Sequence, residues 1–519
     1  MGTGHLSKKE LRLQYSGFIV FTTQVLSVIT GLIFTLLLTR NMHPDQYGIW
    51  TNIFDYTAYF TLFSGLIPFW SVRFMSRGKV GTVKTAILAQ LTITMVAFLL
   101  YFPAIIMITK AIGTQEYLLI YLIAGLYIIT YSMIAVFENL LQSVKPQASG
   151  YGLMIEEIVK VTVALVVILG FRQLFLGAIL ALVVSCFVQI GYYVYLLHGW
   201  FKEKADWDYL KQWLKGSTVI AYSAVGGQLV SFVLILLFLY GGANTRAYYQ
   251  AAFSFTTIIG YSSSLFIALY PKLLAKNCSD EQVGTSFRTV MMLAIPLAAI
   301  TMVMSTSFLT VLNVSYGVAW PVLIALSVNT LVTLIMTFYQ SCLFGVEAFD
   351  AEGKISIRQL VRSKIFKVFT LSYIQAAIAL PIAYFVLTSF KLHGSVDAAV
   401  YVIVILIGVN LSTFAALYWA MHKSIRIPVA WTSIAKYLLS ALLMGVVLFL
   451  IPTTTTLFST IAKAAVGFGI YVVMLLAIDK QARQLIRLIW AEIKGSLKLL
   501  TSKNNNNVSS ENPSAETQN

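Results

Sequence analysis

Charge is scarce in this sequence of 519 residues, and negative charge is scarcer than positive. Only 11% of the residues are charged, whereas 58% are hydrophobic, and the mean hydropathy is +0.81. A water-soluble globular domain carries roughly a quarter of its residues as charged side chains. Such a composition excludes a soluble globular protein, and it predicts an all-α polytopic membrane protein.

Cysteine and histidine are also rare, which limits the chemistry that the chain can support. Cys186, Cys278 and Cys342 lie in or beside apolar runs, and the five histidines are well separated. Neither residue type has the spacing of a metal site or a disulfide framework. No nucleophile stands beside a base in a recognisable motif. We therefore expect no catalytic residue, no metal and no cofactor, and we interpret the protein as a non-enzyme.

Long apolar runs dominate the remaining sequence. Fourteen stretches are long enough to span a bilayer and are bounded by charged or Gly/Pro-rich turns. Their ranges are 15–39, 49–72, 84–109, 117–143, 152–171, 174–199, 217–241, 247–271, 289–312, 317–346, 368–390, 396–421, 436–452 and 456–478. The first run is too long for a typical signal peptide, so we expect it to remain as a span.

Lysine and arginine are distributed unequally between alternate loops. If the N-terminus is cytoplasmic, 29 of the 36 lie in cytoplasmic segments and five in outer loops, and Lys160 and Lys463 fall within spans. This bias predicts a cytoplasmic membrane protein with both termini in the cytoplasm. The net charge of +16 then faces anionic membrane lipids, so it does not indicate nucleic acid as a partner. We interpret Lys463 as a snorkelling surface residue.

A weak internal repeat divides the chain into two lobes. The segments SGLIPFWSVRFMSR (64–77) and SSLFIALYPKLLAK (263–276) each end a span with a proline and two cations. They place span 2 against span 8, an offset of six that is typical of two-lobed transporters. The prediction is about 14 transmembrane helices, arranged as two six-helix lobes plus two appended helices.

The predicted organisation also includes segments outside the spans. The ranges are 1–14 for a cytoplasmic N-terminus, 15–199 for an N-lobe of spans 1–6, 200–216 for a cytoplasmic linker, 217–421 for a C-lobe of spans 7–12, 422–478 for appended spans 13–14, 479–500 for an interfacial amphipathic helix and 501–519 for a disordered tail.

The opening of the sequence resembles a known family. A turn of the form R-x-x-x-P-x-x-Y-G follows the first span and stands here as Arg40, Pro44, Tyr47 and Gly48, while RAYYQAAFSF followed by ALYPKL is similar to the family's eighth span. On these motifs the chain is identified as a member of the lipid-linked polysaccharide (O-antigen-type) flippases of the multidrug/oligosaccharidyl-lipid/polysaccharide exporter superfamily. The resemblance implies two lobes around a central cavity and alternating access. It also implies a cargo of oligosaccharide on a polyprenyl (di)phosphate carrier.

Cations near the membrane are the candidate binding groups for such a cargo. A phosphate that crosses about 30 Å of hydrocarbon needs cationic partners, and arginine suits it by geometry. Arg40 and Arg246 form a repeat-related pair at the outer ends of their spans, and Arg73 and Lys272 form a pair at the inner ends. For each pair, the alternative is an ordinary headgroup anchor. Lys160, about 12 Å inside span 5, is the deepest candidate.

Acidic residues within the spans are candidates for binding a coupling ion, H⁺ or Na⁺. Asp55 lies about 9 Å into span 2. Glu156 and Glu157 stand four and three residues before Lys160, so either can pair with it, and Glu138 lies at a similar depth on span 4. For these groups, the alternative is a hydrogen-bonded contact between helices.

Two other functions compete with the flippase interpretation. One is a cation-coupled multidrug exporter of the same superfamily, which would have an acidic cavity. The other is a membrane glycosyltransferase, because WDY (207–209) is similar to part of an oligosaccharyltransferase motif. That segment lies in a predicted cytoplasmic loop, and no outer loop carries paired acids. The interpretation is therefore a monomeric flippase that is driven by an ion gradient.

Overall fold

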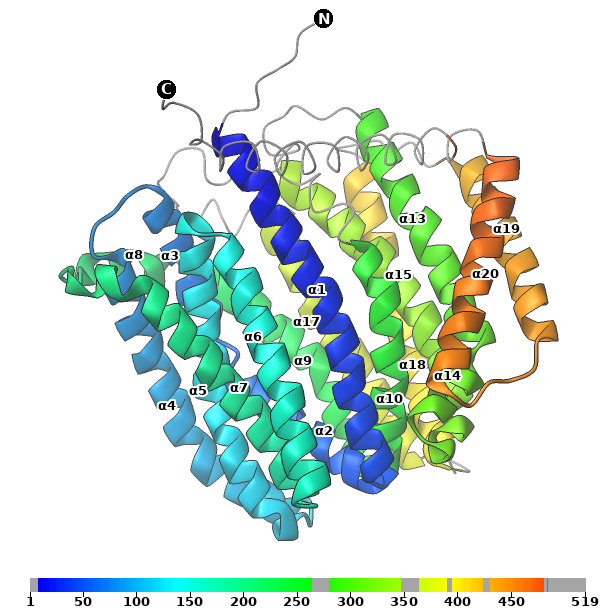
Figure 1. Ribbon diagram of the computed structural model, residues 1–519, viewed down its shortest axis with the longest axis horizontal. Coiled ribbons are helices and arrows are strands. Elements are labelled where there is room, and N and C mark those ends of the chain that lie inside the picture. Colours follow the sequence, from blue (N-terminus) through cyan, green and yellow to red (C-terminus); the bar gives the residue numbers. More distant parts are fainter. Residues whose placement is uncertain are drawn as a thin grey trace, which may run out of the picture.

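The computed structural model describes residues 8–263, 280–346, 364–389, 394–422, 430–479 and 483. These residues form long α-helices, short 3-10 turns and a π-helical segment, and most of the long helices run between the same two faces of the molecule (Figure 1). We name the face at which α1 begins and α20 ends the terminal face. The face at which α1 ends and α2 begins is the opposite face.

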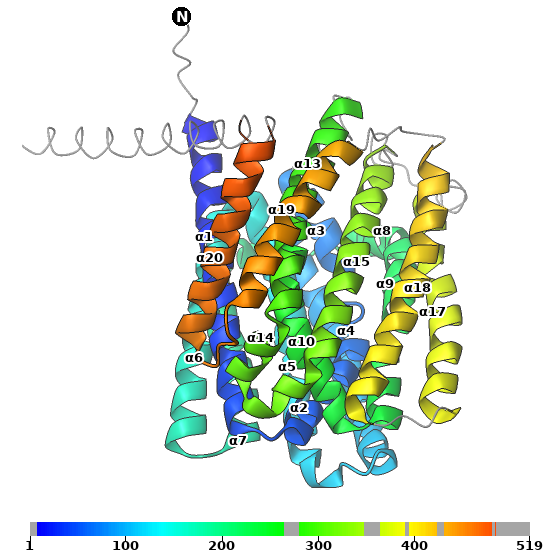
Figure 2. The same cartoon turned by 90° about the vertical axis from the view of Figure 1, so that its right-hand side faces the viewer.

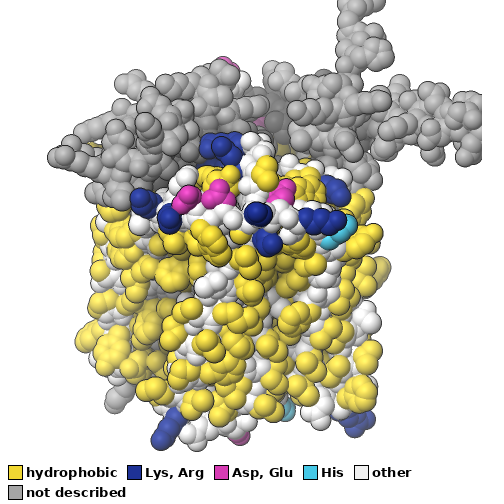
Figure 3. All heavy atoms as spheres, turned by 90° about the vertical axis from the view of Figure 1, so that its left-hand side faces the viewer, with side chains coloured by type: hydrophobic (Ala, Val, Ile, Leu, Met, Phe, Trp, Pro, Cys, Tyr) yellow, Lys and Arg dark blue, Asp and Glu magenta, His cyan; other side chains and the backbone are white. Residues whose placement is uncertain are grey.

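Apolar sequence explains the helices, because a backbone in lipid must satisfy its own hydrogen bonds. Within the described residues, ten helices are long and apolar enough to cross a membrane. A broad apolar band covers the side of the molecule, with charged side chains gathered near its two edges (Figure 3). The chain is thus a multi-pass membrane protein. All fourteen predicted ranges coincide at least in part with helices, whereas the count of fourteen spans stays a prediction.

The first group of helices, which we call the N-terminal half, packs around α5 and α6. Its bounds are α1 Lys8–Asn41, α2 Pro44–Phe60, α3 Leu66–Ser76, α4 Thr82–Ala111, α5 Leu118–Val144, α6 Gln147–Ala164 and α7 Leu174–Leu197. Span 2 is broken into α2 and α3, because Pro68 cannot donate a hydrogen bond to the preceding turn. The end of α6 continues as a π-helical segment, Leu165–Gly170.

The second group, the C-terminal half, begins at α9. Its bounds are α9 Thr218–Gly241, α10 Ala243–Gly260, α13 Asp280–Val303, α14 Ser305–Leu312, α15 Trp320–Val346, α17 Lys364–Ser389 and α18 Ser395–His422. Two further helices, α19 Trp431–Leu450 and α20 Leu457–Ile478, pack against α13 at the edge of this half (Figure 2). The predicted lobe boundaries stay a prediction, and the predicted interfacial helix and tail lie outside the described residues apart from 479 and 483.

Apolar packing joins the two halves mainly at one end. One core includes Ile53 of α2, Leu237 of α9 and Ala251 of α10, so it belongs to both halves. A second core, around Phe287 and Phe338, lies within the C-terminal half and α19–α20. A third lies in the N-terminal half and reaches the linker. The shared core contains the residues next to the opposite face, and the third core lies toward the terminal face, whereas the second extends along the length of α13.

The linker between the halves folds onto the N-terminal half. It contains the helix α8, Trp207–Gly216, which packs on α3 and α4. Glu203 Oε2 accepts a hydrogen bond of 2.6 Å from the Gly81 amide, and the Asp206 amide donates one of 2.8 Å to Thr85 Oγ1. These contacts fix residues 203–206 to the loop before α4 and to the first turn of α4.

The linker ends in a tight junction with α9. Trp70 Nε1 donates to Ser217 Oγ at 3.0 Å, and a Cβ atom on Gly216 would overlap the Trp70 ring. Glycine is therefore required where α8 meets α9, because only a residue without a side chain leaves room for the indole ring.

Candidate functional site

A buried ion pair joins the two halves between α2 and α10. Arg246 Nε donates to Asp55 Oδ2 at 2.7 Å, and Arg246 Nη2 donates to Asp55 Oδ1 at 2.9 Å. The arginine is 3% exposed, so the pair is held almost entirely out of water. Two parallel hydrogen bonds between a guanidinium and a carboxylate are a strong and directional contact. The structure therefore places two predicted site residues, 191 positions apart, in one contact.

Two further partners of Arg246 come from its own helix. Its Nη1 donates to Gln250 Oε1 at 3.1 Å, and its guanidinium lies 5.6 Å from the ring centroid of Tyr249. Buried charges persist when they are paired and hydrogen-bonded. The placement differs from a headgroup anchor, because a snorkelling side chain would reach the surface.

Arg40 makes the reciprocal contact from the other half. It lies in the last turn of α1, and its Nε and Nη2 donate to the Val311 carbonyl of α14 at 3.3 and 3.0 Å. Nearby, Asn313 Nδ2 donates to the Thr39 carbonyl at 3.3 Å. Arg40 is exposed, unlike Arg246. Arg246 of the C-terminal half thus binds the N-terminal half, and Arg40 of the N-terminal half binds the C-terminal half. Both contacts lie next to the opposite face.

Gly48 permits the close approach of α2 and α10 on which this contact depends. A Cβ atom at this position would overlap the Ala243 carbonyl oxygen at the start of α10. Tyr47 beside it packs edge-to-face on Tyr316, with 6.2 Å between ring centroids. The glycine of the predicted R-x-x-x-P-x-x-Y-G turn therefore has a packing role.

Replacement of Gly48 by valine should push α2 away from α10 and open this end of the molecule. We expect a stability loss of about 1–3 kcal/mol from overpacking. We also expect a longer spin-label distance between cysteines introduced at Asn41 and Ser315, which are exposed on the two halves. Gly31→Val is the matched control, because a Cβ atom at Gly31 meets open space. Equal distances in Gly48→Val and the control would contradict the packing role.

A second charged cluster ties α6 to α1, closer to the terminal face. Lys160 Nζ lies 2.8 Å from Glu157 Oε1 and 3.5 Å from Glu156 Oε1, so the lysine pairs with both acids, as their spacing predicts. Glu157 also accepts hydrogen bonds from the hydroxyls of Ser27, at 2.7 Å, and Thr30. The exposed fractions of Lys160 and Glu157 are only 8% and 4%. The carboxylate of Glu157 therefore binds both Lys160 on its own helix and the two hydroxyls on α1.

Glu138 lies close to this cluster but binds a different helix. Its Oε1 accepts hydrogen bonds from Tyr193 Oη at 3.0 Å and from Gln189 Nε2 at 3.3 Å, both on α7. It lies near enough to Glu156 for the two charges to interact. The structure therefore brings all four predicted groups of spans 4 and 5 into one region, in which Lys160 pairs with two acids and the third, Glu138, lies near Glu156.

The other predicted cations lie elsewhere. Arg73 stacks on Phe69 at the end of α3, with its guanidinium carbon 3.8 Å from the ring centroid. Lys272 lies outside the described residues. Lys463 is buried rather than snorkelling at the surface, because the backbone turn after α19 covers it, and its Nζ donates to the carbonyls of Ile451 and Pro452 at 2.8 and 3.2 Å.

The hydroxyls of Ser27 and Thr30 are partners of Glu157 that were not predicted from the sequence. They lie three residues apart and so share one face of α1, a spacing that could have indicated a polar contact. Within the part of the chain that the structure describes, no three His, Cys, Asp or Glu side chains lie where they could hold a metal ion.

Comparison with known proteins identifies the family of the chain. The family model described as a polysaccharide biosynthesis protein matches residues 15–276, just over half of the sequence. The chain belongs to the polysaccharide biosynthesis protein family. The matched range runs from residue 15 within α1 past the end of α10 and therefore contains both charged clusters, so these are built from segments of this family. No curated protein sequence matches the chain.

Solved structures of two kinds of transporter share the fold of this family member. One is the lipid II flippase MurJ in an inward closed conformation. The alignment covers 90% of this chain and 100% of the MurJ chain, with 14% identity and a TM-score of 0.61. The other is an inward-facing multidrug resistance MATE family transporter of the MOP superfamily. That alignment covers 77% of this chain and 96% of the transporter chain, with 14% identity and a TM-score of 0.60. The chain thus has the fold of MOP-superfamily transporters, which confirms the resemblance found in its sequence.

Proposed function

We propose that the protein flips a polyprenyl-(di)phosphate-linked oligosaccharide across the cytoplasmic membrane by alternating access, with an ion gradient as the driving force. Membership of the polysaccharide biosynthesis family supports a glycan cargo, and the transporter fold supports a flipping mechanism. The observation that carries the proposal is the buried Asp55–Arg246 pair between the halves.

In this mechanism Arg246 alternates between two partners, the Asp55 carboxylate and the phosphate of the cargo. When the halves are in contact, the Asp55 carboxylate accepts hydrogen bonds from two donors of Arg246, Nε and Nη2. A phosphate group presents oxygen atoms in a geometry that the same two donors can bind. When the halves separate at the opposite face, the guanidinium exchanges Asp55 for the phosphate of the cargo. Arg40 stands at the same end with donors to the Val311 carbonyl, and it binds the phosphate in the same step.

The cluster around Glu157 supplies the coupling site in this mechanism. Three acids and one lysine leave an excess of negative charge when all four groups are ionised, which favours the binding of H⁺ or Na⁺. The hydroxyls of Ser27 and Thr30 link that site to α1. Binding of a cation to Glu157 would therefore alter the contact between α1 and α6.

The orientation follows from the distribution of basic residues. The terminal face carries the lysine-rich and arginine-rich loops, so we assign it to the cytoplasm together with both termini. Arg73 then lies near the cytoplasmic entrance, where it captures the phosphate. The same role for Lys272, which lies outside the described residues, rests on the sequence alone. We propose that one chain acts as a monomeric transporter and not as an enzyme.

A cation-coupled drug exporter is the second candidate, and one observation favours it. The cluster at Glu138, Glu156 and Glu157 contains more acid than base, which suits a cationic cargo. The MATE transporter with the same fold is a multidrug resistance protein. Family membership and the inter-half arginines favour the flippase over this candidate.

Reconstitution in vesicles distinguishes the two functions. The purified full chain is inserted into vesicles that contain either a polyprenyl-diphosphate-linked oligosaccharide or a fluorescent organic cation. We expect an imposed H⁺ or Na⁺ gradient to move the oligosaccharide to the other leaflet, where a glycan-cleaving enzyme detects it. Gradient-driven movement of the organic cation without movement of the oligosaccharide would support the exporter and reject the flippase.

A further inference from the structure

The linker between the two halves has a surface that none of the preceding functions uses. Trp207, Lys211 and Leu214 follow one another at i, i+4 and i+7 along α8, so they share one flank of the helix. The exposed fractions of Trp207 and Leu214 are 53% and 47%, although both side chains are apolar. Trp213, on another side of α8, is completely buried against α3. One side of this helix is thus packed on protein, and another presents apolar groups outward.

The surroundings of α8 are strongly basic. Residues 73–84 and 200–216 contain eight cations against three acids, a net charge of +5. The cations are Arg73, Arg77, Lys79, Lys84, Lys202, Lys204, Lys211 and Lys215. Two of the three acids accept hydrogen bonds from backbone amides, Glu203 from Gly81 in the α3–α4 loop and Asp206 from Asp208 in the linker. Asp208 pairs with Lys211 at 3.0 Å.

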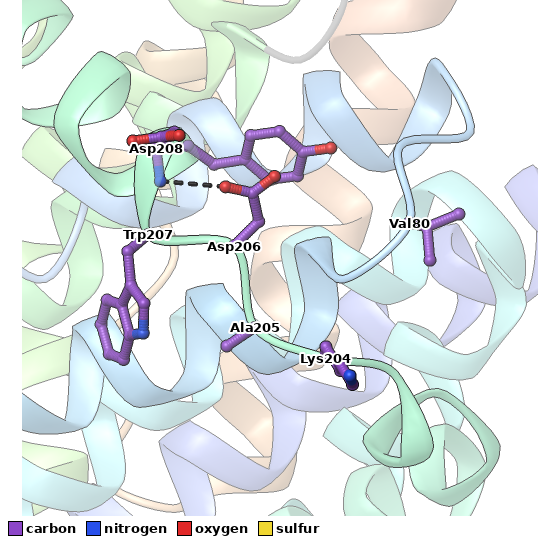
Figure 4. A pocket seen from close by; sticks show the side chains of 7 residues that line it. Val80, Lys204, Ala205, Asp206, Trp207 and Asp208 are labelled. Atoms are coloured by element: carbon purple, nitrogen blue, oxygen red, sulfur yellow. Dashed lines mark hydrogen bonds between the residues drawn. The ribbon is translucent and has the colours of Figure 1, made fainter.

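This basic surface lies at the edge of the apolar band. On the face that includes the α3–α4 and α8 region, Lys and Arg side chains form a row just above the apolar surface of the helices (Figure 3). An open pocket of about 530 Å³ lies where the linker meets the α3–α4 loop. Its lining includes Val80, Lys204 and Trp207, and the Asp206 carboxylate is turned toward the backbone of Asp208 (Figure 4).

We propose that α8 is an interfacial anchor that binds the headgroups of anionic phospholipids. Tryptophan prefers the boundary between hydrocarbon and water, and clustered lysines attract anionic headgroups. In this arrangement Trp207, Leu214 and Val80 enter the acyl boundary, and Lys204, Lys211 and Lys215 meet the phosphates. The lipid is a permanent neighbour and not the transported cargo, so this proposal is independent of the proposed function.

Two measurements on the full chain test the anchor. The first measures quenching of tryptophan fluorescence by phosphatidylcholine brominated near the headgroup, where the difference between the wild-type chain and Trp207→Phe isolates Trp207. We expect strong quenching of Trp207. The second counts phosphatidylglycerol retained by the purified protein in native mass spectrometry. We expect the K211Q/K215Q variant to retain about tenfold less than the wild-type chain.

A matched control removes two exposed cations at the other end of the helices. Lys110 ends α4 and Arg172 precedes α7, and both lie at the opposite face. We expect the K110Q/R172Q variant to retain phosphatidylglycerol like the wild-type chain. Equal retention by K211Q/K215Q and the wild-type chain, or a Trp207 signal that the brominated lipid leaves unquenched, would overturn the proposal. Neither outcome depends on whether the oligosaccharide is transported.

Discussion

Replacement of Arg246 by alanine is expected to abolish oligosaccharide transport and to destabilise the protein. The substitution removes the phosphate donor and leaves the Asp55 carboxylate buried without its cation. Loss of one partner from a buried pair costs about 3–5 kcal/mol, because the remaining charge is uncompensated. The change is measured as the fraction of oligosaccharide that becomes accessible in the vesicle assay and as the temperature of unfolding.

Three further variants separate the cargo role of Arg246 from its role in closing the opposite face. Arg246→Lys keeps the charge but loses the planar two-donor geometry, so we expect weaker transport with little loss of stability. Asp55→Ala/Arg246→Ala should be more stable than Arg246→Ala, because no buried charge is left over. The exchange Asp55→Arg/Arg246→Asp restores a pair but moves the guanidinium to α2. Full transport by this exchanged protein would contradict the cargo role.

The second large effect is expected from Lys160→Ala. This change removes the cation from between Glu156 and Glu157 and leaves an excess of acid in the interior. We expect transport to be lost while the amount of folded protein in the membrane is retained. Retention is expected because Glu157 keeps its hydroxyl partners on α1, and because a buried acid without a cation can take up a proton. Full transport by Lys160→Ala would remove this residue from the mechanism.

The chain offers a matched control for this prediction. Lys463 is also buried, with 7% of its surface exposed against 8% for Lys160, but its ammonium group binds backbone carbonyls at the end of α19. Lys463→Ala should therefore lower stability and leave transport intact. Loss of transport in both variants would show that any buried lysine is required for folding, and would argue against a specific role for Lys160.

Local patterns in the sequence predicted those features that depend on neighbouring residues. Hydropathy located the helical segments, since a backbone in lipid has few alternatives to a helix. The i+3 and i+4 spacing predicted that Lys160 pairs with Glu157 and Glu156. The break between α2 and α3 was not predicted, because hydropathy merges the two helices into one span, although Pro68 carries a signal for it.

Contacts between distant residues were beyond the sequence. Asp55 and Arg246 were separate candidates, one for a coupling ion and one for phosphate, and their pairing depends on how α2 packs on α10. The close approach at Gly48 has the same origin, because it depends on the position of Ala243. A linker of 17 residues with four lysines gave no indication of its docking on the start of α4 and the loop before it.

The junction of α8 with α9 limits how the halves can move. The linker is hydrogen-bonded to the N-terminal half through Glu203 and Asp206, and Ser217 receives the Trp70 hydrogen bond one residue before α9 begins. The linker is therefore held against the N-terminal half along most of its length, up to the residue before α9. If the halves rock against each other as proposed, Gly216 and Ser217 would stay close to the N-terminal half and would lie near the axis of that rotation. Small rotations there become large displacements at the far end of the helices, where Arg40 and Arg246 lie.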